Sequence, residues 1–144
     1  IVGEGPLRKD LELYTKEIGL EQNILFLGEL PREQVHSFLK EIDLFIMASR
    51  SEGFCNALVE AMAAKKRILL SDISTFHEVT EDISDLRFFK VGDIEGLAEK
   101  LRVEIDNPES EKNINRRFDL VMNKYSLEEC SNKYFDEYKK IIGN

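Results

Sequence analysis

Two glutamates, Glu52 and Glu60, stand in the run SEGFCNALVEAMA with seven residues between them. Glu52 belongs to a predicted loop, and residues 56–64 have the alanine, leucine and methionine content of a helix. The first turn of a helix offers unpaired backbone N–H groups and the positive end of the helix dipole, which together favour an anion. This turn therefore predicts a phosphate ligand, with a carboxylate on either side to accept hydrogen bonds from hydroxyl groups.

Gly53 lies between the two carboxylates and permits a close approach of the backbone to a ligand, as well as a positive φ. Carboxylates on both sides of an anion site suit a sugar on one side and a ribose on the other. The structural alternative is that Glu52 only complements a helix N-terminus, an effect of roughly 0.3–1 kcal/mol, and that Glu60 is a solvated helix acid. The Gly-Phe pair after Glu52 and the Ala-Met-Ala run after Glu60 favour the ligand site.

Other reactive or charged residues near this run have competing interpretations. Arg50 could reach a phosphate, although an arginine in a polar loop is more often solvated. Cys55 falls at the predicted helix N-terminus, where the pKa of a thiol can be lowered, but no base is placed near it by sequence, so inert packing is favoured. Cys130 lies on an apolar helical stripe and is predicted to be core. The basic run 65–67 is interpreted as a solvated turn between a helix and a strand.

Short apolar segments alternate with amphipathic ones, and this order predicts an α/β fold with a Rossmann-like parallel sheet flanked by helices. The predicted strands are residues 1–2, 24–27, 44–48, 68–70 and 86–91. Helices are predicted over 7–18, over 31–42, from Asp93 as N-cap to 105, over 109–124, and from Ser126 onward. Ligands of open α/β sheets bind beyond the carboxyl ends of the strands, so the loop 49–55 lies at the predicted binding edge.

Length and composition limit the possible functions. A chain of 144 residues with 42% apolar content can bury one core, so a single domain over 1–144 is predicted, with residues 109–144 as its C-terminal helices. The net charge of −8 disfavours nucleic acid and anionic membrane as partners. Two distant cysteines, no signal peptide and no apolar run near 20 residues favour the cytoplasm. His36 and His77 have no metal-ligand spacing, so no metal site is predicted.

The pattern Glu-Gly-Phe followed by Glu-Ala-Met-Ala resembles the E-x7-E signature of the retaining glycosyltransferases of family 4, which have the GT-B fold of two Rossmann-like halves. Weaker matches follow the family's order at residues 1–8, 24–28 and 43–45, at Ser71-Asp72 with Glu78, and at Asp93 leading 96–98. The resemblance covers essentially the whole chain. It implies an N-terminally truncated piece, most of the C-terminal donor-binding half, without the acceptor half of the same enzyme.

The resemblance also implies roles for the residues of the run. Glu52 would be the catalytic residue and would hydrogen-bond hydroxyls of the donor sugar. The backbone around Gly53, Phe54 and Cys55 would approach the sugar. The remaining donor-binding residues would be the amides near Asn56 and Ala57 on the diphosphate, Glu60 on the ribose diol, and Arg50.

Retaining enzymes of this kind work without a covalent enzyme nucleophile, so the protein positions the reactants and stabilises the departing charge. The donor would be a UDP-, GDP- or ADP-hexose, with no cofactor and no metal, and the acceptor a glycan or a lipid-linked sugar. Envelope or capsular polysaccharide synthesis is the implied pathway. The implied location is the cytoplasm, including the inner face of the membrane through the other half. The isolated fragment is expected to be inactive.

This chain departs from the family where Lys65 and Arg67 replace the usual Gly and Pro, so a strained left-handed residue or a different turn is expected after the helix. Two alternatives remain open. One is a degenerate GT-B-like module that binds without catalysing. The other is a receiver-like signalling domain, which would need clustered acids after the first strand, and Ile1-Val2-Gly3 offers none.

Overall fold

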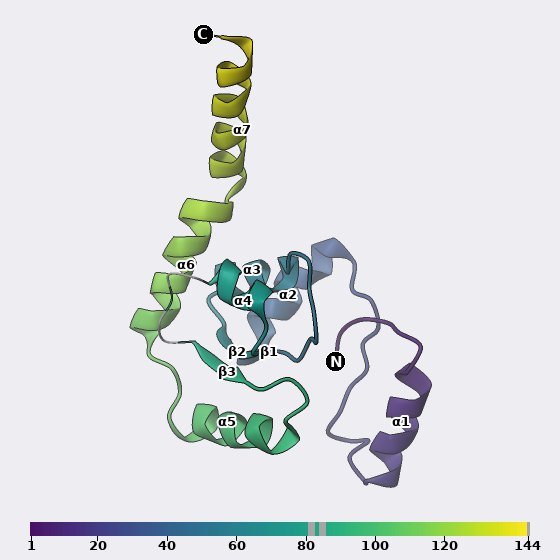
Figure 1. Ribbon diagram of the computed structural model, residues 1–144. Helices are drawn as coiled ribbons and strands as arrows, with labels where there is room; N and C mark the ends of the chain where they lie inside the picture. Colours follow the sequence, from purple (N-terminus) through teal and green to yellow (C-terminus); the bar gives the residue numbers. More distant parts are fainter. Residues whose placement is uncertain (81–82, 84–85, 144) are drawn as a thin grey trace. The chain divides into compact units, whose positions relative to one another are not determined.

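The computed structural model describes residues 1–80, 83 and 86–143 (Figure 1). The chain divides into two compact units, Ile1–Phe38 and Leu39–Asn144, and the boundary falls within helix α2 (Arg32–Glu41). Residue 144, the last of the predicted C-terminal helical range, lies outside the described residues.

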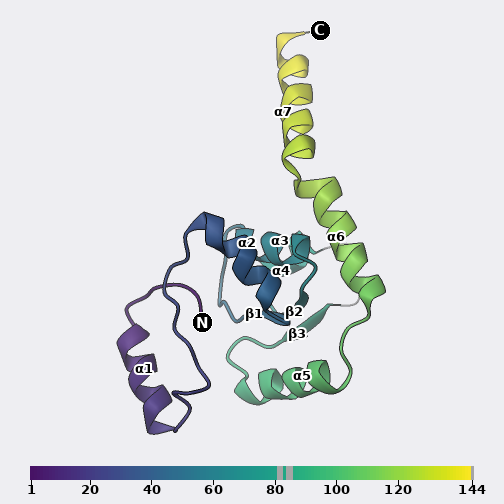
Figure 2. The same ribbon diagram turned by 180° about the vertical axis from the view of Figure 1, so that it is seen from behind.

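The unit from Leu39 onward contains a parallel sheet. Strands β1 (Leu44–Met47), β2 (Arg67–Ser71) and β3 (Arg87–Phe89) lie in the order β1-β2-β3. The register pairs Phe45 with Ile68 and Leu70 with Phe88. Helices α3 (Asn56–Ala63) and α4 (Ser74–Val79) make the two crossovers and lie on one side of the strands, while α5 (Ile94–Asp106) lies on the other (Figures 1 and 2). The predicted α/β fold is confirmed for this unit.

The core of this unit is built around the central strand. Ile68, Leu69 and Leu70 of β2 are at most 1% exposed, because helices cover both faces of the sheet. Leu58 and Met62 of α3 are fully buried against them, as is Phe76 of α4. Helix α4 has no counterpart among the predicted helices, because its six residues are too short for helical periodicity to show.

Side-chain caps start the last three helices. Asp93 accepts a hydrogen bond from the Gly96 backbone amide at 2.9 Å, which confirms the predicted N-cap of α5. Ser110 caps α6 (Glu111–Tyr125), and Ser126 caps α7 (Leu127–Ile142) in the same way. Helix α6 packs against α3. Both predicted C-terminal helices are thereby confirmed over their described residues.

Helix α7 corrects one prediction about the core. None of its residues is buried, and Cys130 is only half-buried rather than part of the core. The aromatic side chains Tyr134, Phe135 and Tyr138 are all exposed. An apolar stripe at helical spacing therefore marks an amphipathic helix here, but not one whose apolar face the described residues cover.

The unit Ile1–Phe38 contains α1 (Arg8–Glu17) and the first part of α2. The strands predicted at 1–2 and 24–27 do not form. One isolated parallel bridge joins Val2 to Gly28, the residue after the second segment. Gly3 and Gly28 have φ of 114° and 71°, outside the extended region, so the pairing cannot continue past them. Strands and helices alternate only from α2 to α5, and the two helices α6 and α7 follow.

Candidate functional site

The loop that follows β1 presents Glu52 at the carboxyl edge of the sheet. Ser49 Oγ donates a hydrogen bond of 2.6 Å to Glu52 Oε1, and the glutamate side chain is half-buried. The carboxylate is therefore held by a residue of its own loop. This is the edge at which ligands of open α/β sheets bind, as the sequence predicted for this loop.

Two hydroxyl groups from other elements hold the backbone of the same loop. Ser71 Oγ, at the end of β2, donates to the Ser49 carbonyl oxygen at 2.6 Å, and Thr75 Oγ1, on α4, donates to the Glu52 carbonyl oxygen at 2.8 Å. Sequence reasoning did not assign either contact. Ser71 was noted only as a weak family match, and nothing in the sequence around Thr75 signals a partner 23 residues away.

Helix α3 begins directly after this loop, at the residues that were predicted to bind phosphate. Cys55 is its N-cap residue, and its side chain makes no capping hydrogen bond to the first turn. Asn56 and Ala57 follow as the first two helical residues, Asn56 exposed and Ala57 half-buried. In the described part of the chain, the first-turn N–H groups of α3 thus lack a side-chain oxygen of the kind that caps α5, α6 and α7.

Cys55 is a packed thiol. It is 3% exposed, and its Sγ lies 3.1 Å from Met47 Sδ. Burial raises the pKa of the Cys55 thiol, the Leu58 backbone amide lowers it, and the carboxylate of Glu52 raises it, with smaller opposing effects from Ala57 and Glu60. The result is a raised pKa, so the thiol stays protonated, in agreement with the packing interpretation.

The two glutamates singled out by spacing lie on either side of the start of α3. Glu52 is in the loop four residues before the first residue of the helix, and Glu60 is the fifth residue of the helix and is exposed. The first turn of α3 therefore lies between them along the chain.

Gly53 does not use the conformational freedom of glycine. Its φ is outside the positive range, and a Cβ added to it would meet nothing within 4 Å. Phe54 is 52% exposed, and its ring meets the Tyr125 ring of α6 edge-on with centroids 5.5 Å apart. Arg50 is exposed on the same loop. A side chain at Gly53 would thus extend into open space.

The basic run 65–67 follows the end of α3, and its side chains contact other parts of the protein. Lys65 has a φ of 56°, the left-handed conformation that was expected from the missing glycine. Its Nζ donates to Asn115 Oδ1 at 2.9 Å and lies 4.4 Å from the centre of the Phe118 ring. Arg67 donates to the carbonyl oxygens of Asp43 and Glu104. These contacts give the run a structural role rather than that of a merely solvated turn.

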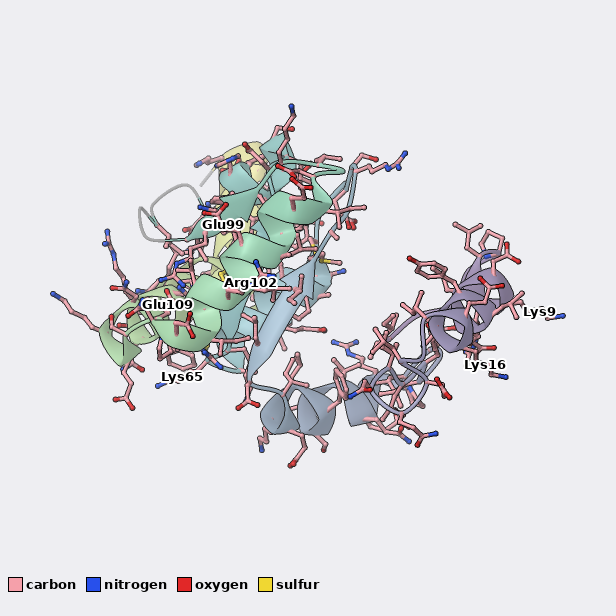
Figure 3. The ribbon with its side chains drawn as sticks, turned by 90° about the horizontal axis from the view of Figure 1, so that it is seen from below. Lys9, Lys16, Lys65, Glu99, Arg102 and Glu109 are labelled. Atoms are coloured by element: carbon pink, nitrogen blue, oxygen red, sulfur yellow. The ribbon has the colours of Figure 1, made fainter. Side chains whose placement is uncertain are left out.

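A buried ion pair lies next to this turn. Arg117 of α6 is fully buried, pairs with Glu109 through two nitrogen atoms, and donates to the Lys66 carbonyl oxygen at 3.2 Å. Figure 3 shows Lys65 and Glu109 at the same end of the unit, with Glu99 and Arg102 on the solvent side of α5. This pair fixes α6 to the end of α3, opposite the predicted ligand end.

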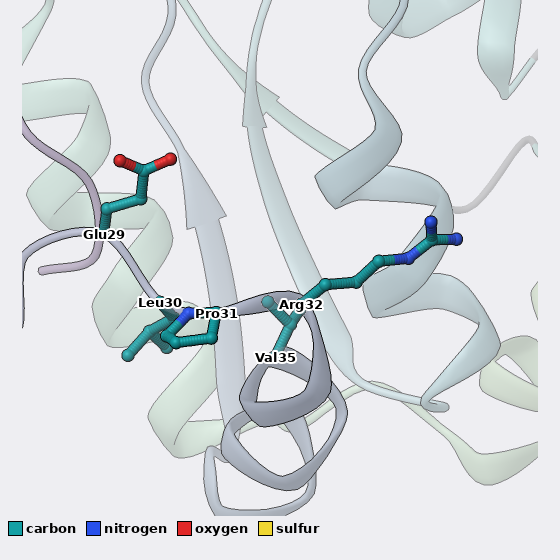
Figure 4. A pocket seen from close by; sticks show the side chains of 5 residues that line it. All are labelled: Glu29, Leu30, Pro31, Arg32 and Val35. Carbon is teal, nitrogen blue, oxygen red and sulfur yellow. The ribbon is translucent and has the colours of Figure 1, made fainter.

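A separate hollow occurs in the unit Ile1–Phe38. It has a volume of about 540 Å³ and is lined by Glu29, Leu30, Pro31, Arg32 and Val35. Figure 4 shows Pro31 and Val35 between the side chains of Glu29 and Arg32, which extend in different directions. None of the predicted site residues lines it.

The described residues contain neither a metal-binding cluster nor a membrane-spanning helix. Within residues 1–80, 83 and 86–143, no three His, Cys, Asp or Glu side chains gather closely enough to hold a metal ion. No helix in that part of the chain combines the length and the apolar content that a bilayer crossing requires.

A parallel sheet with helices on both sides is a Rossmann-like architecture. The family model of glycosyl transferases group 1 matches residues 1–118, and the chain belongs to this family. HepE of Anabaena, solved in complex with UDP and glucose, matches with a TM-score of 0.84 and 18% identity, over 96% of this chain and 39% of that one. The likeness shows the fold, which is that of the C-terminal half of a GT-B glycosyltransferase.

Two relatives are similar in sequence. A lipopolysaccharide core biosynthesis glycosyltransferase of Rhizobium meliloti is 32% identical over 108 residues, 75% of this chain and 31% of the relative. The GDP-mannose:cellobiosyl-diphosphopolyprenol alpha-mannosyltransferase of Xanthomonas oryzae is 25% identical over 135 residues, 93% of this chain and 36% of the relative. The chain spans about a third of the length of the relatives it matches.

Proposed function

We propose that this chain is the donor-binding half of a retaining glycosyltransferase that transfers a hexose from a nucleotide sugar to a glycan or a lipid-linked acceptor. The observation that carries the proposal is the loop at the carboxyl edge of the sheet, where Ser49 holds the Glu52 carboxylate directly before α3. Glu60 follows one turn into that helix, and the first-turn N–H groups have no side-chain cap among the described residues. A diphosphate would complete that turn, because its oxygens are the acceptors that the N–H groups lack.

Each residue then has a chemical task. The carboxylate of Glu52, held through one oxygen by Ser49, would accept hydrogen bonds from hydroxyls of the donor sugar. The amides of Asn56 and Ala57 would bind the diphosphate, and Glu60 would accept from the ribose diol. The helix dipole would stabilise the negative charge that builds up on the leaving diphosphate. No protein nucleophile and no metal ion enters this scheme.

The relatives support the choice of donor and acceptor. HepE was solved with UDP and glucose, and the Xanthomonas relative is named for GDP-mannose and a diphosphopolyprenol acceptor. The Rhizobium relative is named for lipopolysaccharide core biosynthesis. By analogy, the donor of this protein would be a UDP-, GDP- or ADP-hexose, and its product part of an envelope polysaccharide made at the inner face of the membrane.

Titration calorimetry with UDP, GDP and ADP tests the proposal. One nucleotide should bind the wild-type chain. Glu60→Ala should lower the affinity for that nucleotide about tenfold, because a hydrogen bond to a charged group is lost. Glu99→Ala is the matched control, since Glu99 is an exposed helical glutamate on α5, on the other side of the sheet. If no nucleotide binds, or if both variants bind like the wild type, the proposed site is wrong.

Turnover is a separate matter. Catalysis in this scheme requires the acceptor to be held against the donor from the other side of the cleft. The 144 residues alone should therefore bind the donor without transferring it. Sugar transfer by the isolated chain, measured as release of free nucleoside diphosphate, would contradict this part of the proposal.

A further inference from the structure

The backbone of Glu52 is attached to a helix that comes later in the chain. Thr75 Oγ1 on α4 donates a hydrogen bond of 2.8 Å to the Glu52 carbonyl oxygen. Three residues earlier in the loop, the Ser49 carbonyl oxygen accepts from the fully buried hydroxyl of Ser71. These two contacts fix the loop at both ends of the segment 49–52.

The position after Glu52 explains why such an attachment matters. Gly53 has no side chain, and the space around its Cβ position is empty, so packing does not restrain the loop there. Glycine also has the widest choice of backbone conformation. Because packing does not restrain the backbone at Gly53, the hydrogen bond from Thr75 restrains the Glu52 backbone, while Ser49 Oγ holds the carboxylate itself.

Helix α4 is firmly placed and can serve as the support. Its residues Phe76 and Val79 are buried in the core. On its exposed side, His77 Nε2 lies 2.6 Å from Asp72 Oδ1, and the His77 ring stacks on Phe88 of β3 with centroids 4.3 Å apart. The hydroxyl of Thr75 is thus presented from a helix that is held on two sides.

We propose that Thr75 is a positioning residue that sets the direction of the Glu52 carboxylate toward the donor sugar, without touching the donor itself. Ser49 Oγ then completes the orientation, because it holds Oε1 of the same glutamate. This inference rests on the proposed function, in which Glu52 contacts the sugar and the first turn of α3 holds the diphosphate. Loss of the Thr75 hydroxyl should therefore weaken binding of the sugar part of the donor and not of the nucleotide part.

The test compares a nucleotide sugar with its own nucleoside diphosphate. The probes are UDP-glucose and UDP, or GDP-mannose and GDP if the wild type prefers guanosine. Thr75→Val removes the donor hydroxyl at nearly constant shape, and Thr75→Ser retains it. We expect Thr75→Val to weaken binding of the nucleotide sugar about fivefold and to leave the affinity for the nucleoside diphosphate unchanged. Thr75→Ser should keep the wild-type ratio of the two affinities.

Glu52→Gln separates this inference from the function on which it rests. If Glu52→Gln lowers the ratio of the two affinities and Thr75→Val does not, Thr75 is no positioning residue while the proposed function stands. If Glu52→Gln leaves the ratio unchanged, the proposed role of Glu52 is itself wrong. The double variant should lose no more affinity for the nucleotide sugar than Glu52→Gln alone, since both changes act on one contact.

Amide hydrogen exchange gives a second readout. Exchange of the backbone amides over 50–54 should rise in Thr75→Val and stay at the wild-type level in Thr75→Ser. Thr75→Ala replaces the valine variant if urea unfolding shows that valine does not fit. Unchanged exchange in a folded variant without the hydroxyl would overturn the inference.

Discussion

The substitution Gly53→Ala tests whether glycine at this position is needed for folding or for ligand binding. The structure predicts that the fold tolerates alanine, because φ at Gly53 is not positive and the added Cβ would meet nothing within 4 Å. The same open space is where the backbone around Gly53 is proposed to approach the donor sugar. A methyl group there should therefore interfere only with the ligand.

The expected magnitudes follow from these two facts. Replacing glycine by alanine at a compatible backbone conformation stabilises a protein by about 0.4–1 kcal/mol, because the unfolded chain loses conformational freedom. A methyl group forced into space that a bound ligand needs costs about 1–3 kcal/mol, which corresponds to roughly five- to 150-fold weaker binding. Stability and affinity should thus change in opposite directions.

Urea unfolding followed by circular dichroism measures the stability, and calorimetry with the nucleotide sugar measures the affinity. Gly19→Ala is the matched control for the first assay. Its Cβ would also meet nothing within 4 Å, but its φ is 70°, so alanine should cost about 1–2 kcal/mol there through backbone strain alone.

Two results would refute the reasoning on Gly53. A loss of stability close to that of Gly19→Ala would mean that the fold itself requires glycine in the loop. Unchanged affinity in a stable Gly53→Ala protein would mean that the ligand does not approach this part of the backbone, and the proposed sugar position would have to move along the loop.

Two further predictions concern the opposite end of α3. Lys65→Gly should be more stable than Lys65→Ala by about 1 kcal/mol, because both variants lose the contacts to Asn115 and Phe118 and only glycine accepts a φ of 56° without strain; equal stability in urea would show that the turn rearranges. Glu109→Ala should cost about 3–5 kcal/mol, since it leaves the fully buried guanidinium of Arg117 without its carboxylate. Replacing Arg117 by leucine as well should recover most of this loss in the same assay, and a Glu109→Ala protein as stable as the wild type would show that water reaches the pair.

The local sequence was sufficient for most of the individual elements. The apolar run at 68–70 predicts a buried parallel strand, and it forms the central strand of the sheet. Asp93 and Ser126 predict helix starts, and both cap their helices. These features depend on neighbours within one turn or one strand, so they can be read along the chain.

Predictions failed where the outcome depends on distant residues. Segments 1–2 and 24–27 have strand composition, yet the structure has only one bridge here, between Val2 and Gly28. Cys130 lies on an apolar stripe, yet no described part of the chain buries α7. Periodicity shows that a face is apolar, and it cannot show what covers that face.

The sequence by itself determined the strands and helices from α2 to α7 except for the short helix α4, and it singled out Glu52 and Glu60 with the helix turn between them. Only the tertiary structure decided how Glu52 is held. Its carbonyl oxygen accepts from Thr75, and the loop before it accepts from Ser71, because β1 and β2 are neighbours in the sheet and α4 follows β2. Spacing along the chain carries the local geometry of a helix or a loop, whereas a contact across 23 residues exists only once the strands have paired.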